Sequence, residues 1–257
     1  MGRNTRRRNT SDVPVHEQAD FNVGQQEGFN AEAGVGVTEA TAYRRWELDT
    51  VAPYCTGSVL EVGSGAGHFS KQLVKLGLRR LVLSDTAPDC LSTLRATYGG
   101  EPGVEVVDLA LPGTVDIEPV DAIVAMNVIE HIEDDAAAVR DLAAALTPGG
   151  VMIHWVPAYM ALYGDFDRKI GHYRRYTPAM MRTVVEQAGL RVETLRPINF
   201  LGGIGWWLAV HRGGVQQPRK QLVWIFDKIA IPLTRAAERF IRPPFGQSVL
   251  CIARKPA

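Results

Sequence analysis

The stretch that decides the fold is Ser58-Val-Leu-Glu-Val-Gly-Ser-Gly-Ala-Gly-His68, where a short apolar run breaks into three glycines at alternate positions. The run Val59–Val62 predicts a buried parallel strand, and the amphipathic segment His68–Leu76 that follows it ends before Gly77. A strand, a glycine-rich turn and a helix in this order indicate a nucleotide site in an open α/β sheet. The alternative is an ordinary glycine-rich turn in a βαβ unit.

The spacing of the glycines separates two classes of nucleotide site. A dinucleotide fingerprint, G-x-G-x-x-G, needs its third glycine where this chain has His68, which disfavours an NAD-dependent enzyme. The observed order is G-x-G-x-G, made by Gly63, Gly65 and Gly67, with Glu61 two residues before it. This pattern resembles the first motif of class I S-adenosylmethionine-dependent methyltransferases. Glycines let the backbone approach a ligand closely, and the acidic Glu61 suits a ligand that carries an ammonium group.

Composition limits the other classes of function. The chain has 257 residues, 46% hydrophobic content and a formal net charge of zero, which predicts a globular protein and gives no support for a nucleic-acid partner. Cys55, Cys90 and Cys251 lie too far apart for a disulfide framework or a CxxC metal site, which favours a reducing, cytoplasmic setting. The longest apolar stretches, 198–210 and 222–233, are too short to span a bilayer.

Helices and strands alternate along most of the chain. Residues 1–37 are polar and aperiodic and predict a flexible N-terminal segment, followed by one methyltransferase domain over 38–257. The alternation implies a parallel sheet with right-handed crossovers. The expected helices are 38–51, 68–76, 88–98, 134–146 and one from Thr177 to Gly189, and the expected strands are 59–62, 80–83, 104–107, 122–126, 151–156, 191–195 and 248–254.

The last third of the chain departs from the resembled family. There, strands six and seven form a nearly continuous antiparallel hairpin, whereas here residues 196–247 separate them. A structureless loop of that length is improbable, and the segment is apolar and aromatic. We therefore expect a doubly wound, Rossmann-like α/β sheet of seven strands with an antiparallel last strand and a helical, substrate-capping insert between strands six and seven. A dimer contact and a membrane-surface patch are the alternatives for this insert.

The resemblance also implies where the cofactor binds. Asp85, at the end of the second strand, would accept hydrogen bonds from the ribose hydroxyls, and Asp108 would accept one from the adenine amino group. Leu109 would pack near the adenine ring, and Asn127 would lie beside the methionine part. Alternatives are a helix-capping role for Asp85 and a turn-initiating role for Asp108. All four residues follow strands, so they are expected at one edge of the sheet.

The segment Asn127-Val-Ile-Glu-His-Ile132 resembles one common in small-molecule members of the family. His131 is either a general base or a residue that packs against the loop. Some quinone-pathway O-methyltransferases hold a divalent cation here with E-x-x-E-H. This chain has Asn127 where that pattern has its first Glu, which removes an anionic ligand, so no metal is expected.

The loop 163–177 is rich in ionisable and aromatic groups. Histidine has an intrinsic pKa near neutrality, which suits proton abstraction and makes His172 the second candidate base. Arg174 and Arg175 would hold a substrate carboxylate or phosphate through paired donors. The alternative is a solvated loop with Arg–Asp bridges to Asp165 and Asp167.

The helix before the first strand carries Tyr43 and Trp46. In the resembled family such a helix often closes over the cofactor, and the alternative is an amphipathic helix that packs Trp46 on the sheet. The residues expected to contact substrate are Tyr43, Arg174, Arg175, Tyr176 and Trp206.

Together these features predict an enzyme that transfers a methyl group from S-adenosylmethionine to O, N or C of a small-molecule acceptor, in bacterial secondary metabolism, and releases S-adenosylhomocysteine. Two other functions are compatible with the sequence. One is a cyclisation or rearrangement that keeps the cofactor, and the other is a catalytically silent protein that uses the aromatic insert for partner contacts. The expected partners are a small acceptor, a second copy in a homodimer, and a membrane surface touched peripherally.

Overall fold

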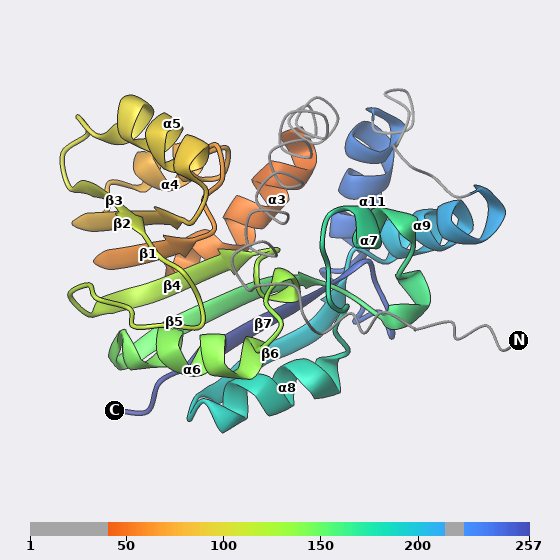
Figure 1. Ribbon diagram of the computed structural model, residues 1–257. Coiled ribbons are helices and arrows are strands. Elements are labelled where there is room, and N and C mark those ends of the chain that lie inside the picture. Colours follow the sequence, from red (N-terminus) through yellow and green to blue (C-terminus); the bar gives the residue numbers. More distant parts are fainter. Residues whose placement is uncertain (1–40, 214–223) are drawn as a thin grey trace, which may run out of the picture.

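The computed structural model describes residues 41–213 and 224–257, so the expected segment 1–37 lies outside the described residues. Seven strands form one sheet in the order β3-β2-β1-β4-β5-β7-β6 (Figure 1). Strands β1 to β5 pair in parallel, and β7 runs antiparallel to both of its neighbours. The predicted α/β sheet with an antiparallel last strand is therefore confirmed. The bounds are β1 Ser58–Val62, β2 Arg80–Asp85, β3 Val104–Asp108, β4 Val120–Met126, β5 Leu146–Pro157, β6 Arg191–Ile198 and β7 Ser248–Arg254.

Helices cover both faces of the sheet. Figure 1 shows α3, α4 and α5 on one face and α6 and α8 on the other. Successive side chains of a strand point to opposite faces, so the strands supply two separate cores. Val59 packs in the core under α3 and α5, whereas Leu60 packs in the core under α6 and α8. The bounds are α3 Thr41–Val51, α4 Ser70–Leu73, α5 Pro88–Tyr98, α6 Asp135–Ala144 and α8 Pro178–Gln187, with 3₁₀ turns η1 Ala52–Tyr54, η2 Val74–Leu76 and η3 Ile129–His131.

Local capping explains where several helices begin and end. The Thr177 side chain accepts a hydrogen bond from the Met180 N–H at the start of α8, directly before Pro178. Helix α6 is shorter than expected at its end, because Leu146 pairs with Val120 and already belongs to β5. The expected helix over 68–76 divides into α4 and η2, which Gly77 ends with φ of 65°.

The described part of the insert is helical, as expected. It comprises α9 (Phe200–Gly213), the π-helical turn η5 (Phe226–Ala230) and α11 (Ile231–Ala237). These helices lie beyond one end of the sheet (Figure 1). Nearby are the short helix α7 (Asp165–Lys169) and the 3₁₀ turn η4 (Met160–Leu162). Within the described ranges, no helix combines the length and the apolar character that crossing a membrane requires.

One residue joins the insert to the first described helix. Both carboxylate oxygens of Asp227 are engaged there: Oδ1 accepts from the backbone N–H groups of Ala42 and Tyr43 at 2.8 and 3.0 Å, and Oδ2 from the Thr41 hydroxyl at 3.4 Å. These N–H groups belong to the first described turn of α3, and at a helix start such groups need an acceptor from outside the helix. Asp227 therefore acts as an N-terminal cap supplied from another part of the chain.

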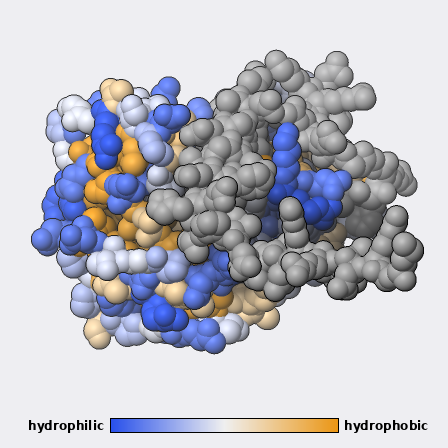
Figure 2. Space-filling view, in the orientation of Figure 1, coloured by the Kyte–Doolittle hydropathy of each residue, from blue (hydrophilic) through white to orange (hydrophobic). Residues whose placement is uncertain are grey.

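The hydropathy of the molecular surface varies across the face seen in Figure 2. Figure 2 shows apolar residues reaching the surface on the side of β1 to β3 and α5, between margins of hydrophilic residues. The strand ends expected to hold the adenine and ribose belong to this half of the sheet.

Candidate active site

The glycine turn after β1 has the left-handed backbone that its sequence predicts. Gly63 and Gly65 have φ of 65° and 55°, values that side-chain-bearing residues rarely adopt. A Cβ atom on Gly63 would lie 2.8 Å from Val128 Cγ2, so glycine is also required there for packing. A Cβ atom on Gly65 would meet nothing within 4 Å, so this residue borders open space.

Asp85 connects the end of β2 to that turn. Its Oδ2 accepts a hydrogen bond from the Gly65 N–H at 2.8 Å, and its Oδ1 accepts from the N–H groups of Thr86 and Ala87, both at 2.9 Å. The latter two contacts precede α5, whose N-cap is Ala87, and the Asp85 side chain caps none of its first-turn N–H groups, so the capping alternative is not observed. The carboxylate is partly exposed, so it remains within reach of a ligand beside Gly65.

The Glu61 side chain packs inside the protein, beneath the glycine turn, and not on its solvent-exposed side. It is buried and accepts a hydrogen bond from Ser70 Oγ at 2.5 Å. Burial raises the pKa of this carboxyl to about 7, against the opposing effect of the Ser70 hydrogen bond. The expected contact with an ammonium group stays a prediction. Gly67 is likewise packed, because its carbonyl accepts from the Tyr98 hydroxyl at 2.9 Å.

The other expected cofactor residues lie along the same edge. Asp108 is the register partner of Asp85 in the pairing of β2 with β3, and its side chain is exposed. The Leu109 N–H donates to the Asp85 carbonyl at 3.1 Å, and its side chain is buried. Asn127, exposed at the end of β4, has φ of 55°. For a residue other than glycine this left-handed backbone is strained, and such strain concentrates at functional sites.

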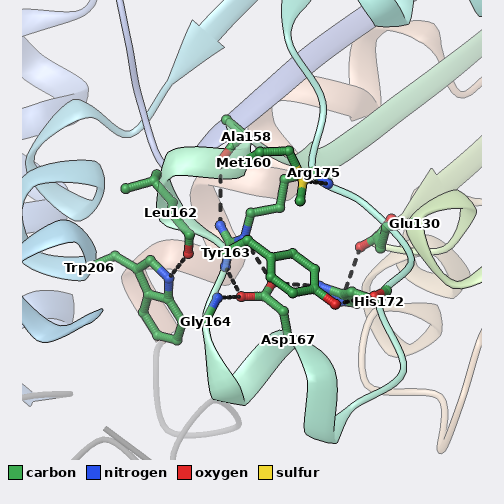
Figure 3. Close-up of polar contacts among 10 residues, drawn as sticks. All are labelled: Glu130, Ala158, Met160, Leu162, Tyr163, Gly164, Asp167, His172, Arg175 and Trp206. Atoms are coloured by element: carbon green, nitrogen blue, oxygen red, sulfur yellow. Dashed lines mark hydrogen bonds and ion pairs between the residues drawn. The ribbon is translucent and has the colours of Figure 1, made fainter. Parts of the chain in front are cut away.

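A second group of polar residues lies in the loop after β5 (Figure 3). Asp167 is fully buried on α7, and its Oδ1 contacts His172 Nδ1 at 2.7 Å. Arg175 donates to both Asp167 oxygens, from Nε at 2.7 Å and Nη2 at 3.1 Å. Burial works to raise the pKa of Asp167, but the hydrogen bonds from His172 and Arg175 lower it below its usual range. Asp167 is therefore a buried carboxylate that orients an imidazole.

Glu130 and His131 face this pair from the turn η3. Glu130 Oε1 lies 3.8 Å from His172 Nε2, and the rings of His131 and His172 meet edge to face at 4.6 Å. Neither Glu130 oxygen has a hydrogen-bond partner among the described residues, and burial raises the pKa of this carboxyl to about 8. Burial and the neighbouring His172 lower the pKa of His131 to about 3. At neutral pH Glu130 is thus a neutral acid and His131 a neutral imidazole.

These three side chains also have the composition of a metal site. Glu130, His131 and His172 each offer one ligand atom, and the three atoms lie within 4.8 Å of one another. A divalent ion would find two imidazoles and one carboxyl here. His172 contacts Asp167 through Nδ1 and leaves Nε2 for an ion, as metal-bound histidines commonly do, whereas Asn127 supplies no anionic ligand. The expectation of no metal stays a prediction.

Most of the expected substrate residues have partners within the protein. Tyr176 is fully buried and donates to Asp135 Oδ2 at 2.6 Å, and Arg174 Nη1 pairs with Asp135 Oδ1 at 2.7 Å. The Arg–Asp alternative holds at both carboxylates, since Asp165 pairs with Arg168 and Asp167 with Arg175, but the second pair is buried rather than solvated. A substrate contact from any of these groups stays a prediction that this packing does not favour.

The aromatic candidates line two different regions. Tyr43 accepts a hydrogen bond from Trp155 Nε1 at 3.0 Å, and Trp46 packs edge to face on Trp155, as the alternative for this helix expects. Trp206 of α9 donates to the Leu162 carbonyl at 2.9 Å, and its ring lies 5.5 Å from the Arg175 guanidinium carbon (Figure 3). The insert therefore reaches the Asp167–His172 pair directly.

Sequence reasoning missed two features: that Asp167 orients His172, and that the buried Glu130 carboxyl has no hydrogen-bond partner among the described residues. Both carboxylates stand in segments that we singled out, but no spacing rule indicates that a short helix such as α7 turns Asp167 back onto His172. The capping role of Asp227 had no local signal, because its partners lie 185 residues earlier.

Comparisons with known proteins agree with this geometry. Residues 42–195, more than half of the chain, match a family described as a methyltransferase domain. A protein of Mycolicibacterium smegmatis named as a probable S-adenosylmethionine-dependent methyltransferase is 29% identical over 189 residues, which cover 70% of each chain. The ubiquinone biosynthesis O-methyltransferase of Xanthomonas axonopodis pv. citri is 29% identical over 153 residues, 52% of this chain and 63% of that enzyme.

The fold has close structural counterparts as well. An S-adenosylmethionine-dependent methyltransferase from Mesorhizobium loti superposes with a TM-score of 0.57 at 16% identity, over 82% of this chain and 98% of that one. At this identity the likeness concerns the fold alone. Taken with the family match, the glycine turn and the carboxylates at successive strand ends, it leads to one assignment: the chain belongs to the class I S-adenosylmethionine-dependent methyltransferases.

Proposed function

We propose that this enzyme methylates a hydroxyl oxygen of a small-molecule acceptor. The observation that carries the proposal is the contact of 2.7 Å between Asp167 Oδ1 and His172 Nδ1. A hydroxyl must lose its proton as the methyl group arrives, whereas the cofactor itself supplies the electrophile. An imidazole held in one orientation by a buried carboxylate is suited to accept that proton.

The two candidate bases differ in their environment. With its pKa lowered to about 3, His131 is too weak a base to take a proton efficiently at neutral pH. His172 has a carboxylate on Nδ1, which stabilises the charged ring that forms when Nε2 takes a proton. We therefore assign proton removal to His172 and a neutral, packing role to His131. Asp167 is the positioning residue.

For the cofactor, we propose binding along the strand ends of β1 to β4. The open side of Gly65 lies beside Asp85, which suits a ribose held by that carboxylate, and Asp108 follows at the neighbouring strand end. Asn127, whose left-handed backbone ends β4, would contact the methionine part of the cofactor. The full set is Glu61, Gly63, Gly65, Gly67, Asp85, Asp108, Leu109 and Asn127.

The acceptor would lie between this edge and the insert. Trp206 and Phe166 meet edge to face with ring centroids 5.3 Å apart, so α9 forms an aromatic wall beside α7. That the relatives include ubiquinone biosynthesis O-methyltransferases supports an oxygen acceptor and a role in bacterial biosynthesis, including secondary metabolism.

Two measurements test the proposal. First, titration with S-adenosylhomocysteine should show binding that Asp85→Ala weakens by about tenfold or more, because roughly one charge-assisted hydrogen bond is lost. Asp89 is also acidic and exposed, and Asp89→Ala should leave the affinity unchanged. Second, a panel of phenols, hydroxy acids and amines should yield a product heavier by one CH₂. His172→Ala should lower turnover by roughly 10²-fold or more without changing cofactor affinity, and Tyr173→Ala, its exposed neighbour, should not.

Other outcomes would redirect the assignment. Methylation of amines alone, insensitive to His172→Ala, would contradict the oxygen proposal. A product of unchanged mass would favour cyclisation or rearrangement, and cofactor binding without turnover on any acceptor would favour the silent protein.

A further inference from the structure

The helical segment over residues 224–237, made of η5, α11 and the two residues before them, has its polarity reversed. On a soluble helix the buried stripe is normally apolar and the exposed stripe polar. The buried positions of the segment and its C-cap are Asp227, Ile231, Thr234 and Glu238, three or four residues apart, so they share one face, and three of the four are polar. The exposed positions are largely apolar, with Leu233 at 59% exposure and Phe240 just beyond the helix at 89%. The exposed apolar side chains are Trp224, Ile225, Ile229, Leu233, Phe240 and Ile241, here called the apolar face.

Polar contacts hold the segment in this orientation. Asp227 caps α3 as described, and Glu238 Oε1 accepts from the Phe200 N–H at 3.1 Å while Oε2 lies 3.7 Å from Arg196. Rotating the helix to bury the apolar face would expose these carboxylates and leave their backbone partners unpaired, which is unfavourable for each group. The apolar face is therefore fixed outward by the protein's own hydrogen bonds.

The charges exposed on the segment that carries the apolar face have one sign. Over residues 224–242 the acidic groups, Asp227 and Glu238, are both buried. The exposed charged residues of this segment are Lys228, which pairs with Asp227, and Arg239 and Arg242, which flank Phe240 and Ile241; on the neighbouring α3, the exposed Asp49 is paired with Arg235. Apolar side chains between exposed cations fit a surface that is apolar inside and negatively charged outside.

We propose that the apolar face docks on the surface of an anionic lipid bilayer. Its aliphatic and aromatic side chains would enter the boundary between headgroups and acyl chains, while Arg239 and Arg242 contact lipid phosphates. Docking of this kind lays the helix in the interface without spanning it.

A second copy of the chain is the less suitable occupant. In a two-fold symmetric dimer the same patch meets itself. Arg239 and Arg242 of one copy would then approach those of the other, with no exposed carboxylate on residues 224–242 to offset the repulsion. A bilayer of anionic lipid supplies the missing negative charge.

Vesicle sedimentation of the full chain tests the proposal. The protein should pellet with phosphatidylcholine–phosphatidylglycerol vesicles and much less with pure phosphatidylcholine, and high salt should weaken the binding. The double variant Leu233→Glu/Phe240→Glu should lower the partition coefficient by about tenfold or more, and Arg239→Glu/Arg242→Glu should remove the preference for anionic lipid. Met180→Glu, which changes an exposed methionine on α8 at another part of the fold, is the matched control and should bind as the wild type does.

Folding is checked independently of lipid. All variants should keep wild-type affinity for S-adenosylhomocysteine, so a failure of the methyltransferase proposal and a failure of docking give different results. Absence of sedimentation with anionic vesicles would overturn the proposal. A concentration-dependent dimer in light scattering that Leu233→Glu dissociates, together with no lipid binding, would assign the apolar face to a second copy instead.

Discussion

Asp167 accepts a hydrogen bond from His172 Nδ1 at 2.7 Å while Arg175 donates to both of its oxygens. The arginine fixes the carboxylate, and the carboxylate fixes the ring. Because Nδ1 is committed as a donor, Nε2 of the neutral imidazole is left as the acceptor, and it points toward Glu130 and His131.

This relationship predicts the behaviour of Asp167→Asn. The amide can present its N–H₂ to Nδ1 and so favour the wrong tautomer, which should lower turnover by roughly 10²-fold or more. The affinity for S-adenosylhomocysteine should be unchanged. Rates measured across pH should show a displaced acidic limb, where the base loses its proton, a change that a purely structural role would not produce.

Loss of the carboxylate also leaves Arg175 buried without its counter-charge, at a cost of about 3–5 kcal/mol. His172→Gln keeps the Asp167–Arg175 pair and is therefore the companion variant. If both variants retain full turnover while folded, His172 takes no part in proton removal.

Two glycines of the turn after β1 should respond differently to the same substitution. Gly63→Ala and Gly65→Ala both place a side chain at positive φ, which costs about 1–2 kcal/mol. Only the Gly63 methyl group also meets Val128, so it should lower the free energy of unfolding further. The Gly65 methyl group enters open space beside Asp85 and should mainly weaken cofactor binding. Urea unfolding and calorimetry on the pair measure both effects, and equal losses of affinity would contradict this division.

Removing the cap of α3 should loosen the first described helix. Asp227→Ala leaves the N–H groups of Ala42 and Tyr43 without their acceptor, which should lower the free energy of unfolding by about 0.5–2 kcal/mol. Amide hydrogen exchange should then accelerate in the first turn of α3 more than in α5. Asp227→Asn, which keeps an acceptor oxygen, should restore much of the protection, and uniform exchange in both variants would speak against a cap.

The buried acid Glu130 should make stability depend on pH. Its pKa is about 8 in the folded protein against 4.5 without burial, so the unfolded chain binds fewer protons between these values. The free energy of unfolding therefore falls as pH rises from about 4.5 to about 8, by at most about 1.4 kcal/mol per pH unit from this group.

Glu130→Gln removes that titration. Relative to the wild type it should be more stable at the basic end of this window than at the acidic end, as urea unfolding at several pH values would show. Glu133→Gln, the exposed neighbour, should follow the wild-type curve. A constant difference between Glu130→Gln and the wild type at every pH would mean that Glu130 is ionised in the folded protein.

The sequence predicted those parts of the structure that depend on neighbouring residues. Helix α5 and strand β7 have the expected bounds, because Pro88 starts the one and an uninterrupted apolar run defines the other. The edge that gathers Asp85, Asp108 and Asn127 follows from parallel strands ending together. Features that depend on distant partners were beyond the sequence, such as the pairing of Leu146 with Val120, which shortens α6 and lengthens β5.

The same limit applies to the candidate site. His172 was identifiable from its chemistry, since imidazole is the side chain that titrates near neutrality. Its orientation was not, because Asp167 reaches it through a turn of α7 that no periodicity indicates. Arg175 and Tyr176 resembled substrate ligands in a polar loop, whereas the structure commits them to Asp167 and Asp135.

The cap that Asp227 places on α3 has a consequence for the order of events during synthesis. Translation proceeds from the N-terminus, so α3 leaves the ribosome long before residue 227 has been made. Until then the N–H groups of Ala42 and Tyr43 in the first described turn of α3 lack their acceptor from Asp227, and a helix without tertiary contacts is marginal. The helix that packs on Trp155 of β5 therefore becomes secure only late in synthesis, at the same stage in which β7, Ser248–Arg254, completes the sheet.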